Sequence, residues 1–230
     1  MTKDNKKTLI GVLTFLSYFL YTALQFVPLS ILGINYNDLS LISKIAYLLL
    51  YELIFILILF LIYHKTFISD IKDYIKNFKD YVKNYFEYWA LAFGLMIVSN
   101  LFIVTLFPDA MATNQENINS IMSFAPLYVI VSACVYAPFL EETIFRLSIR
   151  NFIKNDKLFI FVSGIIFGGL HVITSFENLI DLIYIIPYSI PGFVFAYTLV
   201  KSKNIFVPMS LHFFHNTFTI LMQLILTSLV

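Results

Sequence analysis

Residues 44–63 read KIAYLLLYELIFILILFLIY, and after the initial lysine Glu52 is the only charged side chain in this run. An apolar run of about 18 residues or more is long enough to cross the hydrocarbon core of a bilayer as one α-helix. Several other stretches share this character. Of all 230 residues, 60% are hydrophobic and 13% are charged. A soluble domain is about half apolar and about a quarter charged. The sequence therefore predicts an all-α, polytopic membrane protein.

Hydropathy predicts about seven membrane spans in one helical bundle. They lie at residues 8–32, 44–63, 88–107, 122–150, 158–176, 179–200 and 205–229. The first run is longer than the apolar region of a secretory signal, so we interpret it as a retained helix. Pro138 in the fourth span, and Pro187 and Pro191 in the sixth, are expected to free backbone carbonyls and bend their helices.

Basic residues fall on alternate junctions between these spans. They precede the first span and lie between the second and third, the fourth and fifth, and the sixth and seventh; only Lys44 falls on the other side. Because cytoplasmic loops are enriched in Lys and Arg, we expect the N-terminus in the cytoplasm and the C-terminus outside. Frequent Phe, Ile, Asn, Lys and Tyr are typical of AT-rich coding, which favours a bacterial cell membrane.

Two connecting segments carry further predictions. Residues 64–87 combine apolar residues at helical spacing with lysines. This pattern is typical of an amphipathic interfacial helix on the anionic cytoplasmic leaflet, and a solvated linker helix is the alternative. Residues 108–120 contain no basic residue and are expected to form an extracytoplasmic loop. The chain thus divides into N-terminal membrane helices, 1–121, and a core, 122–230, that carries most of the intramembrane polar residues.

The fourth predicted span contains two adjacent carboxylates and an arginine, in PFLEETIFRL. A single charge near the bilayer centre costs about 2.5–3.5 kcal/mol, so such residues are functional suspects. Glu142 and Arg146 are four apart, which places them on one helix face where they can form an ion pair. Glu141 is rotated by about 100° from its neighbour and points elsewhere. A purely structural salt-bridge cluster is the alternative.

Two later spans carry histidines. The fifth contains FGGLH, which ends at His171, and the seventh contains HFFHN, which begins at His212 and ends at Asn216. His212 and Asn216 share one helix face. Gly168 and Gly169 are expected to permit close helix packing. A lone intramembrane histidine is usually a packing residue, but two beside a carboxylate pair indicate a polar site.

The depths of these residues in the bilayer are similar. Counted from the nearest basic anchor at 1.5 Å per residue, Glu141 and His212 lie about 13 Å deep and His171 about 21 Å deep. All three fall in the middle band of a core about 30 Å thick. At this depth the three residues can line one buried polar cavity. A carboxylate in such a cavity can take a proton from water with the help of a neutral histidine, which activates the water. The other histidine and the Asn216 amide can donate hydrogen bonds to an oxyanion.

In this order, the motifs resemble those of the CPBP family, the CAAX proteases and bacteriocin-processing enzymes also called Abi. The motifs are EExxxR at 141–146, FxxxH at 167–171 and HxxxN at 212–216, and the resemblance covers about 125–220. It implies an intramembrane protease that hydrolyses a peptide bond in a membrane-associated protein or peptide.

The resemblance also implies a role for each motif residue. The first glutamate activates water with the help of the first histidine, and the second histidine and the asparagine stabilise the oxyanion. The catalytic residues implied are Glu141, Glu142, His171, His212 and Asn216. The residues that orient the site are Arg146 and Phe167.

Three alternatives stay open at this point. No cofactor is favoured, but two histidines and a glutamate also suffice for catalytic zinc, which His171, His212 and Glu141 would bind. A proton-coupled transporter could use the same residues as a relay, although no internal repeat of the kind usual in transporters is present. A non-catalytic membrane adaptor is the third. The net charge of +1 gives no indication of a nucleic-acid partner.

We predict that single cysteines introduced at 64–87, in a variant that lacks Cys134, escape an impermeant maleimide on intact cells. Cysteines near the C-terminus should be labelled, because the positive-inside rule places that end outside. Labelling after permeabilisation is the control for reactivity. Labelling of 64–87 on intact cells would reverse the topology.

Overall fold

The computed structural model describes residues 2–108, 112–173 and 176–228, and within these ranges it is helical with no strand. The elements of the N-terminal part are α1 (Lys3–Ala23), α2 (Val27–Ile31), η1 (Tyr36–Asp38), α3 (Leu41–Lys76), α4 (Phe78–Leu106) and α5 (Thr113–Phe124). Those of the C-terminal part are α6 (Pro126–Val131), η2 (Ser132–Tyr136), α7 (Ala137–Glu142), η3 (Thr143–Ser148), α8 (Ile149–Phe152), α9 (Asp156–Ile173), η4 (Leu179–Tyr184), α10 (Ile185–Ser202) and α11 (Phe206–Ser228).

Five helical segments of the described chain are long and apolar enough to cross a membrane. They are α3, α4, the composite helix Pro126–Phe152, α9, and Leu179–Ser202. These correspond to the second to sixth predicted spans and confirm an all-α, integral membrane bundle. The helices predicted as the first and seventh spans, α1 and α11, are not among these five. α1 also ends at Ala23, short of the predicted boundary at residue 32, and α2 follows as a separate short helix.

The predicted interfacial segment at 64–87 is helical, but it is not an element of its own. α3 continues without a break to Lys76, and α4 begins at Phe78. The apolar spacing of the segment continues that of the flanking spans, and no Pro or Gly interrupts it, so both helices extend into it. Only Asn77 separates them. Its placement on the cytoplasmic leaflet stays a prediction.

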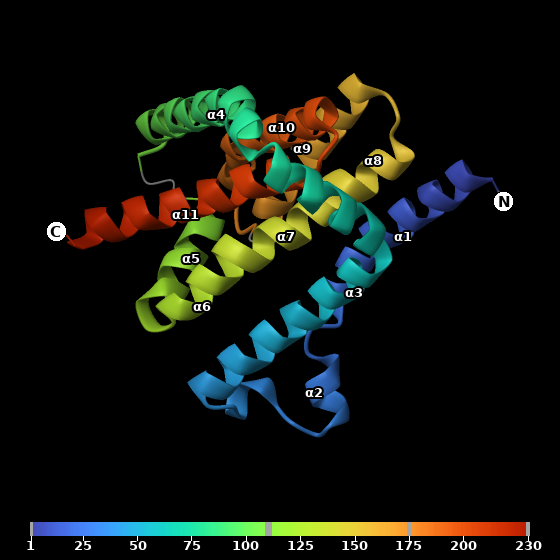
Figure 1. The fold of residues 1–230 in the computed structure, drawn as a ribbon. Helices are drawn as coiled ribbons and strands as arrows, with labels where there is room; N and C mark the ends of the chain where they lie inside the picture. Colours follow the sequence, from blue (N-terminus) through green and yellow to red (C-terminus); the bar gives the residue numbers. More distant parts are fainter. Residues whose placement is uncertain (1, 109–111, 174–175, 229–230) are drawn as a thin grey trace.

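The prediction of a loop at 108–120 is wrong from Thr113 onward, and residues 109–111 of that segment lie outside the described ranges. Helix α5 begins at Thr113 and runs to Phe124, and the side chains of Thr113 and Met122 are buried. The helix is polar and short, so its sequence gives a weak helical signal, and its packing against α6 and α9 stabilises it. α5 thereby lies over the end of α9 that carries His171 (Figure 1).

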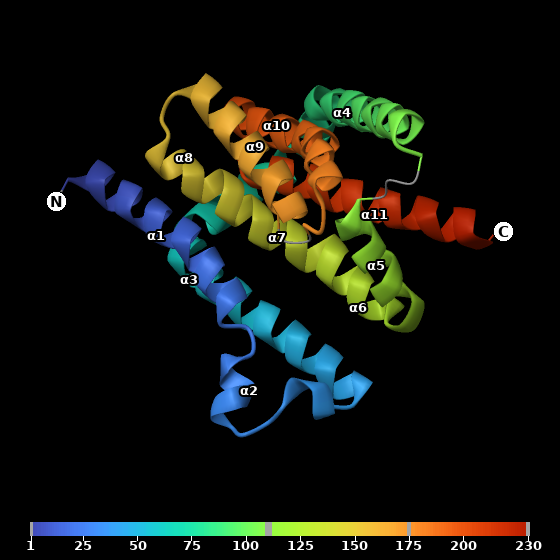
Figure 2. The same ribbon diagram turned by 180° about the vertical axis from the view of Figure 1, so that it is seen from behind.

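Helices α9 and α10 pack side by side in both views of the bundle (Figures 1 and 2). Glycine permits this contact, because a Cβ on Gly168 would lie 2.1 Å from Ser189 Oγ and one on Gly192 would lie 2.9 Å from the Gly164 carbonyl oxygen. The predicted packing role of Gly168 is confirmed. Gly169 has no such neighbour, since a Cβ there would come no closer than 4.0 Å to Ile173.

The composite helix that crosses the centre of the bundle contains two π-helical segments, η2 and η3. Pro138 lies in the first turn of α7, directly after η2, so a wide turn accommodates the ring that the sequence predicted would disturb the helix. π-helical turns occur often at functional sites. Here η3 begins immediately after Glu142.

The start of α11 is fixed by the C-terminal end of α3. The Asn204 amide donates to the Asp70 carbonyl oxygen at 2.7 Å and to Asp73 Oδ2 at 2.8 Å, and the Ile205 N–H donates to Asp70 Oδ2 at 3.0 Å. A carboxylate at this position also interacts favourably with the helix dipole. These hydrogen bonds fix the position of α11 relative to α3, two turns before His212.

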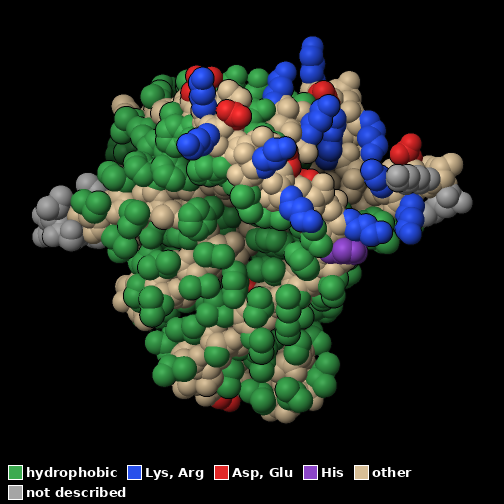
Figure 3. All heavy atoms as spheres, viewed as in Figure 1, with side chains coloured by type: hydrophobic (Ala, Val, Ile, Leu, Met, Phe, Trp, Pro, Cys, Tyr) green, Lys and Arg blue, Asp and Glu red, His purple; other side chains and the backbone are tan. Residues whose placement is uncertain are grey.

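Charge is distributed unevenly over the surface. In the view of Figure 3, Lys and Arg side chains gather over the upper and right-hand part of the molecule, whereas the lower part, around α2, is mostly hydrophobic. This separation in space agrees with the separation along the chain from which the orientation was predicted. Extensive exposed apolar surface on α3 and α4 is as expected for helices that contact lipid.

Candidate active site

A buried ion pair lies at the centre of the site. Arg146 Nε is 3.2 Å from Glu142 Oε2, and neither side chain is exposed to solvent. The second carboxylate oxygen, Oε1, is 2.8 Å from His212 Nδ1 on α11. The predicted pairing of Glu142 with Arg146 is therefore confirmed in the structure. Glu142 joins the composite helix to α11 through one carboxylate.

Cation–π contacts and a hydrogen bond also hold the Arg146 guanidinium in place, in addition to its ion pair with Glu142. Its Cζ lies 4.3 Å from the centre of the Phe167 ring and 5.5 Å from that of Phe195. Cation–π contacts of this kind are stabilising where water is excluded. Nη2 donates a hydrogen bond to the Gly192 carbonyl oxygen at 3.3 Å. Phe167, a predicted motif residue, thus contacts the arginine directly, while the contribution of α10 was not predicted.

Glu141 faces away from this pair, as its rotation predicted. Its Oε2 atom is 3.9 Å from His171 Nε2 and 3.8 Å from His212 Nε2. These distances are too long for direct hydrogen bonds but within the span of a single bridging water. The Glu141 and His171 side chains are 18% and 23% exposed, whereas His212 is 3% exposed. The site therefore opens on the side of Glu141 and His171.

The hydrogen bonds of both histidines define where their protons lie. A backbone carbonyl can only accept, so His171 Nδ1–H donates to the Phe167 carbonyl oxygen at 2.9 Å. In a neutral ring this leaves a lone pair on Nε2, the atom that faces Glu141. His212 Nδ1–H likewise donates to the Glu142 carboxylate. Stacking fixes both rings, His171 on Tyr188 at 5.1 Å and His212 on Phe195 at 4.9 Å.

Asn216 is engaged differently from the other motif residues. Its Nδ2 donates to the Ala133 carbonyl oxygen at 2.7 Å, within the π-helical segment η2. One of the two amide N–H groups is therefore used to attach α11 to η2. His215, on the same helix, packs against Phe93 and Phe195 at ring distances of 6.0 and 6.3 Å. It lies on the α4 side of α11.

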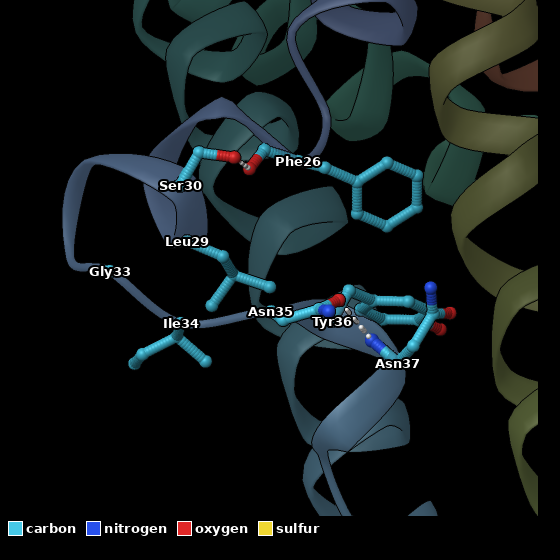
Figure 4. A pocket seen from close by; sticks show the side chains of 8 residues that line it. All are labelled: Phe26, Leu29, Ser30, Gly33, Ile34, Asn35, Tyr36 and Asn37. Carbon is cyan, nitrogen blue, oxygen red and sulfur yellow. Dashed lines mark hydrogen bonds between the residues drawn. The ribbon is translucent and has the colours of Figure 1, made fainter.

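A small cavity lies next to the site. A cavity of about 10 Å³, close to the smallest that can hold one water, adjoins His171 and is lined by Tyr188, Asp181 and residues of α5. A larger hollow of about 530 Å³ lies elsewhere, between α2 and η1. Figure 4 shows Phe26, Leu29, Tyr36 and Asn37 around it. No residue of the predicted site lines this hollow.

The donor set for zinc, His171, His212 and Glu141, has suitable chemistry. Zinc–ligand bonds of about 2.0–2.2 Å in a tetrahedral site place neighbouring donor atoms about 3.3–3.6 Å apart. The separations here are 3.8 and 3.9 Å. Within the described ranges, no group of three or more His, Cys, Asp or Glu residues is arranged to hold a metal ion. The geometry as it stands is wider than a zinc site.

Known proteins share the part of the chain that carries the motifs. Residues 123–218 match the family model described as type II CAAX prenyl endopeptidase Rce1-like. "Putative membrane peptidase YdiL" of Bacillus subtilis (strain 168) is 36% identical over 114 residues, 48% of this chain and 43% of the relative. "UPF0177 protein YvdC" of Lactococcus lactis subsp. lactis (strain IL1403) is 28% identical over 140 residues, 60% of this chain and 51% of the relative. No solved structure gives a significant match.

The family match covers residues 123–218, less than half of the chain, and it supports the resemblance of the motifs to the CPBP proteases. The matched segments span about half the length of the two curated relatives. All three motifs lie inside the matched region, on the helices that form the Glu142–Arg146–His212 assembly.

We predict that Arg146→Met destabilises the protein and lowers its activity, because the Glu142 carboxylate is left buried without its cation. Removal of one partner of a buried pair typically costs about 3–5 kcal/mol. Thermal unfolding in detergent measures the effect. Arg150→Met is the matched control, since its ion pair with Asp156 is partly exposed and contributes little. Equal melting temperatures for the two variants would show that the buried pair is not structurally important.

Proposed function

We propose that this protein is an intramembrane endopeptidase that hydrolyses a peptide bond of a membrane-associated protein or peptide with a water activated by glutamate and histidine. The observation that carries the proposal is the placement of Glu141 Oε2 and His171 Nε2, 3.9 Å apart on the more open side of the site. The family match of residues 123–218 and the name of the Bacillus relative support a peptidase.

The two acceptor atoms suit one water molecule. A water between them donates one O–H to the Glu141 carboxylate and the other to the His171 lone pair. Its own lone pair is then directed toward an incoming carbonyl carbon. As the new C–O bond forms, the proton moves to Glu141, which is general-base catalysis. The same proton then passes to the departing amine, so the carboxylate is regenerated.

The oxyanion that forms during the attack requires hydrogen-bond donors. We assign this role to His212 Nε2 and to the second N–H of the Asn216 amide, the first being used by Ala133. Because the Nδ1–H of His212 is bonded to Glu142, this role requires a second proton on the ring, at Nε2. The metal-free form of the mechanism is the one that we propose.

We predict that Glu141→Gln loses at least 10²–10⁴-fold in turnover while it keeps its fold, because the amide cannot accept a proton from water. Removing an intramembrane charge does not add a solvation cost, so stability should be unchanged or higher. The measurement is cleavage of membrane-partitioning peptides by the purified protein in nanodiscs, together with its melting temperature.

Three further variants control for the position of the base. His171→Ala and His212→Ala should be inactive and folded, whereas His215→Ala should keep substantial turnover, because His215 lies on the α4 side of α11. Normal turnover by Glu141→Gln would remove the assignment of the base and favour an adaptor or a transporter instead.

We predict that activity survives exhaustive treatment with a chelator such as 1,10-phenanthroline, because the proposed mechanism needs no metal. The measurement is turnover before treatment, after it, and after zinc is restored. Activity that disappears with the chelator and returns with zinc would instead make His171, His212 and Glu141 metal ligands.

A further inference from the structure

A second intramembrane carboxylate, Glu52, lies outside the site described above. It is half-buried on α3, a helix whose membrane-crossing part is otherwise apolar. Ser132 Oγ lies 3.0 Å from both of its carboxylate oxygens, and the Tyr128 hydroxyl donates to Oε1 at 3.2 Å. All of these donors are neutral. No ion pair to Glu52 is found within the described residues.

The hydrogen-bonding capacity of this carboxylate is not used up. An ionised carboxylate has about four lone-pair positions, and the two hydroxyls supply two protons. The contrast with Glu142 is informative, because that carboxylate has an arginine and a histidine as partners. A carboxylate at this depth costs several kcal/mol when it has no cation, and a bound cation offsets that cost.

Glu52 lies where α3 leaves the bundle. Along α3 no residue before Phe55 is buried, whereas Phe55, Leu59, Tyr63 and Phe67 form one buried stripe. Glu52 is thus the last polar group before the packed core, and a ligand can approach it from the membrane side. Tyr51, the residue before Glu52 on α3, stacks on Tyr21 of α1 at a ring distance of 4.9 Å. Aromatic rings next to a carboxylate favour a cationic ligand.

The position of Glu52 relative to the candidate active site indicates how many peptide residues separate it from the scissile bond. Ser132, which contacts Glu52, precedes Glu141 by nine residues on the same composite helix, or about 13 Å at 1.5 Å per residue. An extended peptide advances about 3.3–3.5 Å per residue. A peptide with its scissile bond at Glu141 therefore reaches Glu52 with a residue about four positions away.

We infer that Glu52, Ser132 and Tyr128 form a subsite that binds a basic group of the peptide substrate, a lysine or arginine side chain or a free ammonium, about four residues from the scissile bond. This inference rests on the proposed function for its role in specificity. As a binding site for a cationic peptide it has a test of its own.

The binding test uses Glu141→Gln protein, so that no peptide is consumed, in phosphatidylcholine nanodiscs. The probes are fluorescein-labelled 14-residue Leu/Ala peptides with one lysine, or with one N-acetyl-lysine of nearly the same shape and no charge. Because a hydrogen bond to a charged group is worth about 1.5–3 kcal/mol, the lysine peptide should bind about tenfold more tightly or better. Introducing Glu52→Gln into the Glu141→Gln protein should remove the preference for the lysine peptide. Binding of the acetyl-lysine peptide should be unchanged.

Glu116→Gln is the matched control, since it removes an exposed carboxylate from α5 and should keep the preference for lysine. A lysine preference that persists in the Glu52→Gln background overturns the inference. A loss of affinity for both peptides alike also overturns it, and would make Glu52 a residue that positions η2.

A cleavage test separates this inference from the proposed function. On protein with an intact Glu141, a lysine scanned along the peptide should raise kcat/KM most when it lies about four residues from the cleaved bond, and Glu52→Gln should abolish that maximum. If no peptide is cleaved while the lysine preference in binding holds, the endopeptidase proposal fails and the cation site stands. If cleavage proceeds with no dependence on lysine position, the subsite fails and the endopeptidase proposal stands.

Discussion

The ion pair between Glu142 and Arg146 is the interaction on which the rest of the site depends. Both side chains are fully buried, and an isolated charge in that position would be very costly. Paired, they form a rigid connection between helices. Glu142 reaches α11 through His212, and Arg146 reaches α10 through Gly192 and Phe195 and α9 through Phe167. One buried pair therefore fixes three helices relative to the composite helix.

The same arrangement gives the two adjacent carboxylates, Glu141 and Glu142, different environments. Consecutive residues of a helix point about 100° apart, so Glu142 pairs with Arg146 and His212 Nδ1, whereas Glu141 lies near His171 and the other ring nitrogen of His212. Glu142 has its charge compensated and is inaccessible. Glu141 is partly exposed and lies near two imidazole Nε2 atoms without a direct hydrogen bond to either. A partly exposed carboxylate held beside a fixed histidine is the arrangement that a general base requires.

Features that follow from local spacing were predictable from the sequence. The Glu142–Arg146 pair follows from a spacing of four residues, and the closeness of Glu141 to His171 and His212 agrees with their similar spacing from basic residues along the chain. Contacts that depend on tertiary packing were not predictable. Ala133 gives no sequence signal that its carbonyl oxygen accepts from Asn216, because any residue carries such an oxygen.

Helix α5 illustrates the same limit at the level of the fold. Its residues, TNQENINSIMSF, are polar enough to suggest a loop, and packing of Met122 against neighbouring helices decides otherwise. Likewise, the basic pattern at 64–87 indicated a helix but not its continuity with α3 and α4. The helices that carry the three motifs were predicted more accurately, because several independent features of the sequence coincide there: charged residues in apolar runs, their spacing from basic residues, and glycines.

A double-mutant cycle on Glu142 and Arg146 tests the central claim most directly. Glu142→Gln, Arg146→Met and the double variant are unfolded in detergent, and the three changes in the free energy of unfolding are compared. If the pair acts as a unit, each single change leaves a buried charge without its ion-pair partner. The double variant should then be more stable than the sum of the single effects predicts, by about 1 kcal/mol or more. Additivity within about 0.5 kcal/mol would contradict the account.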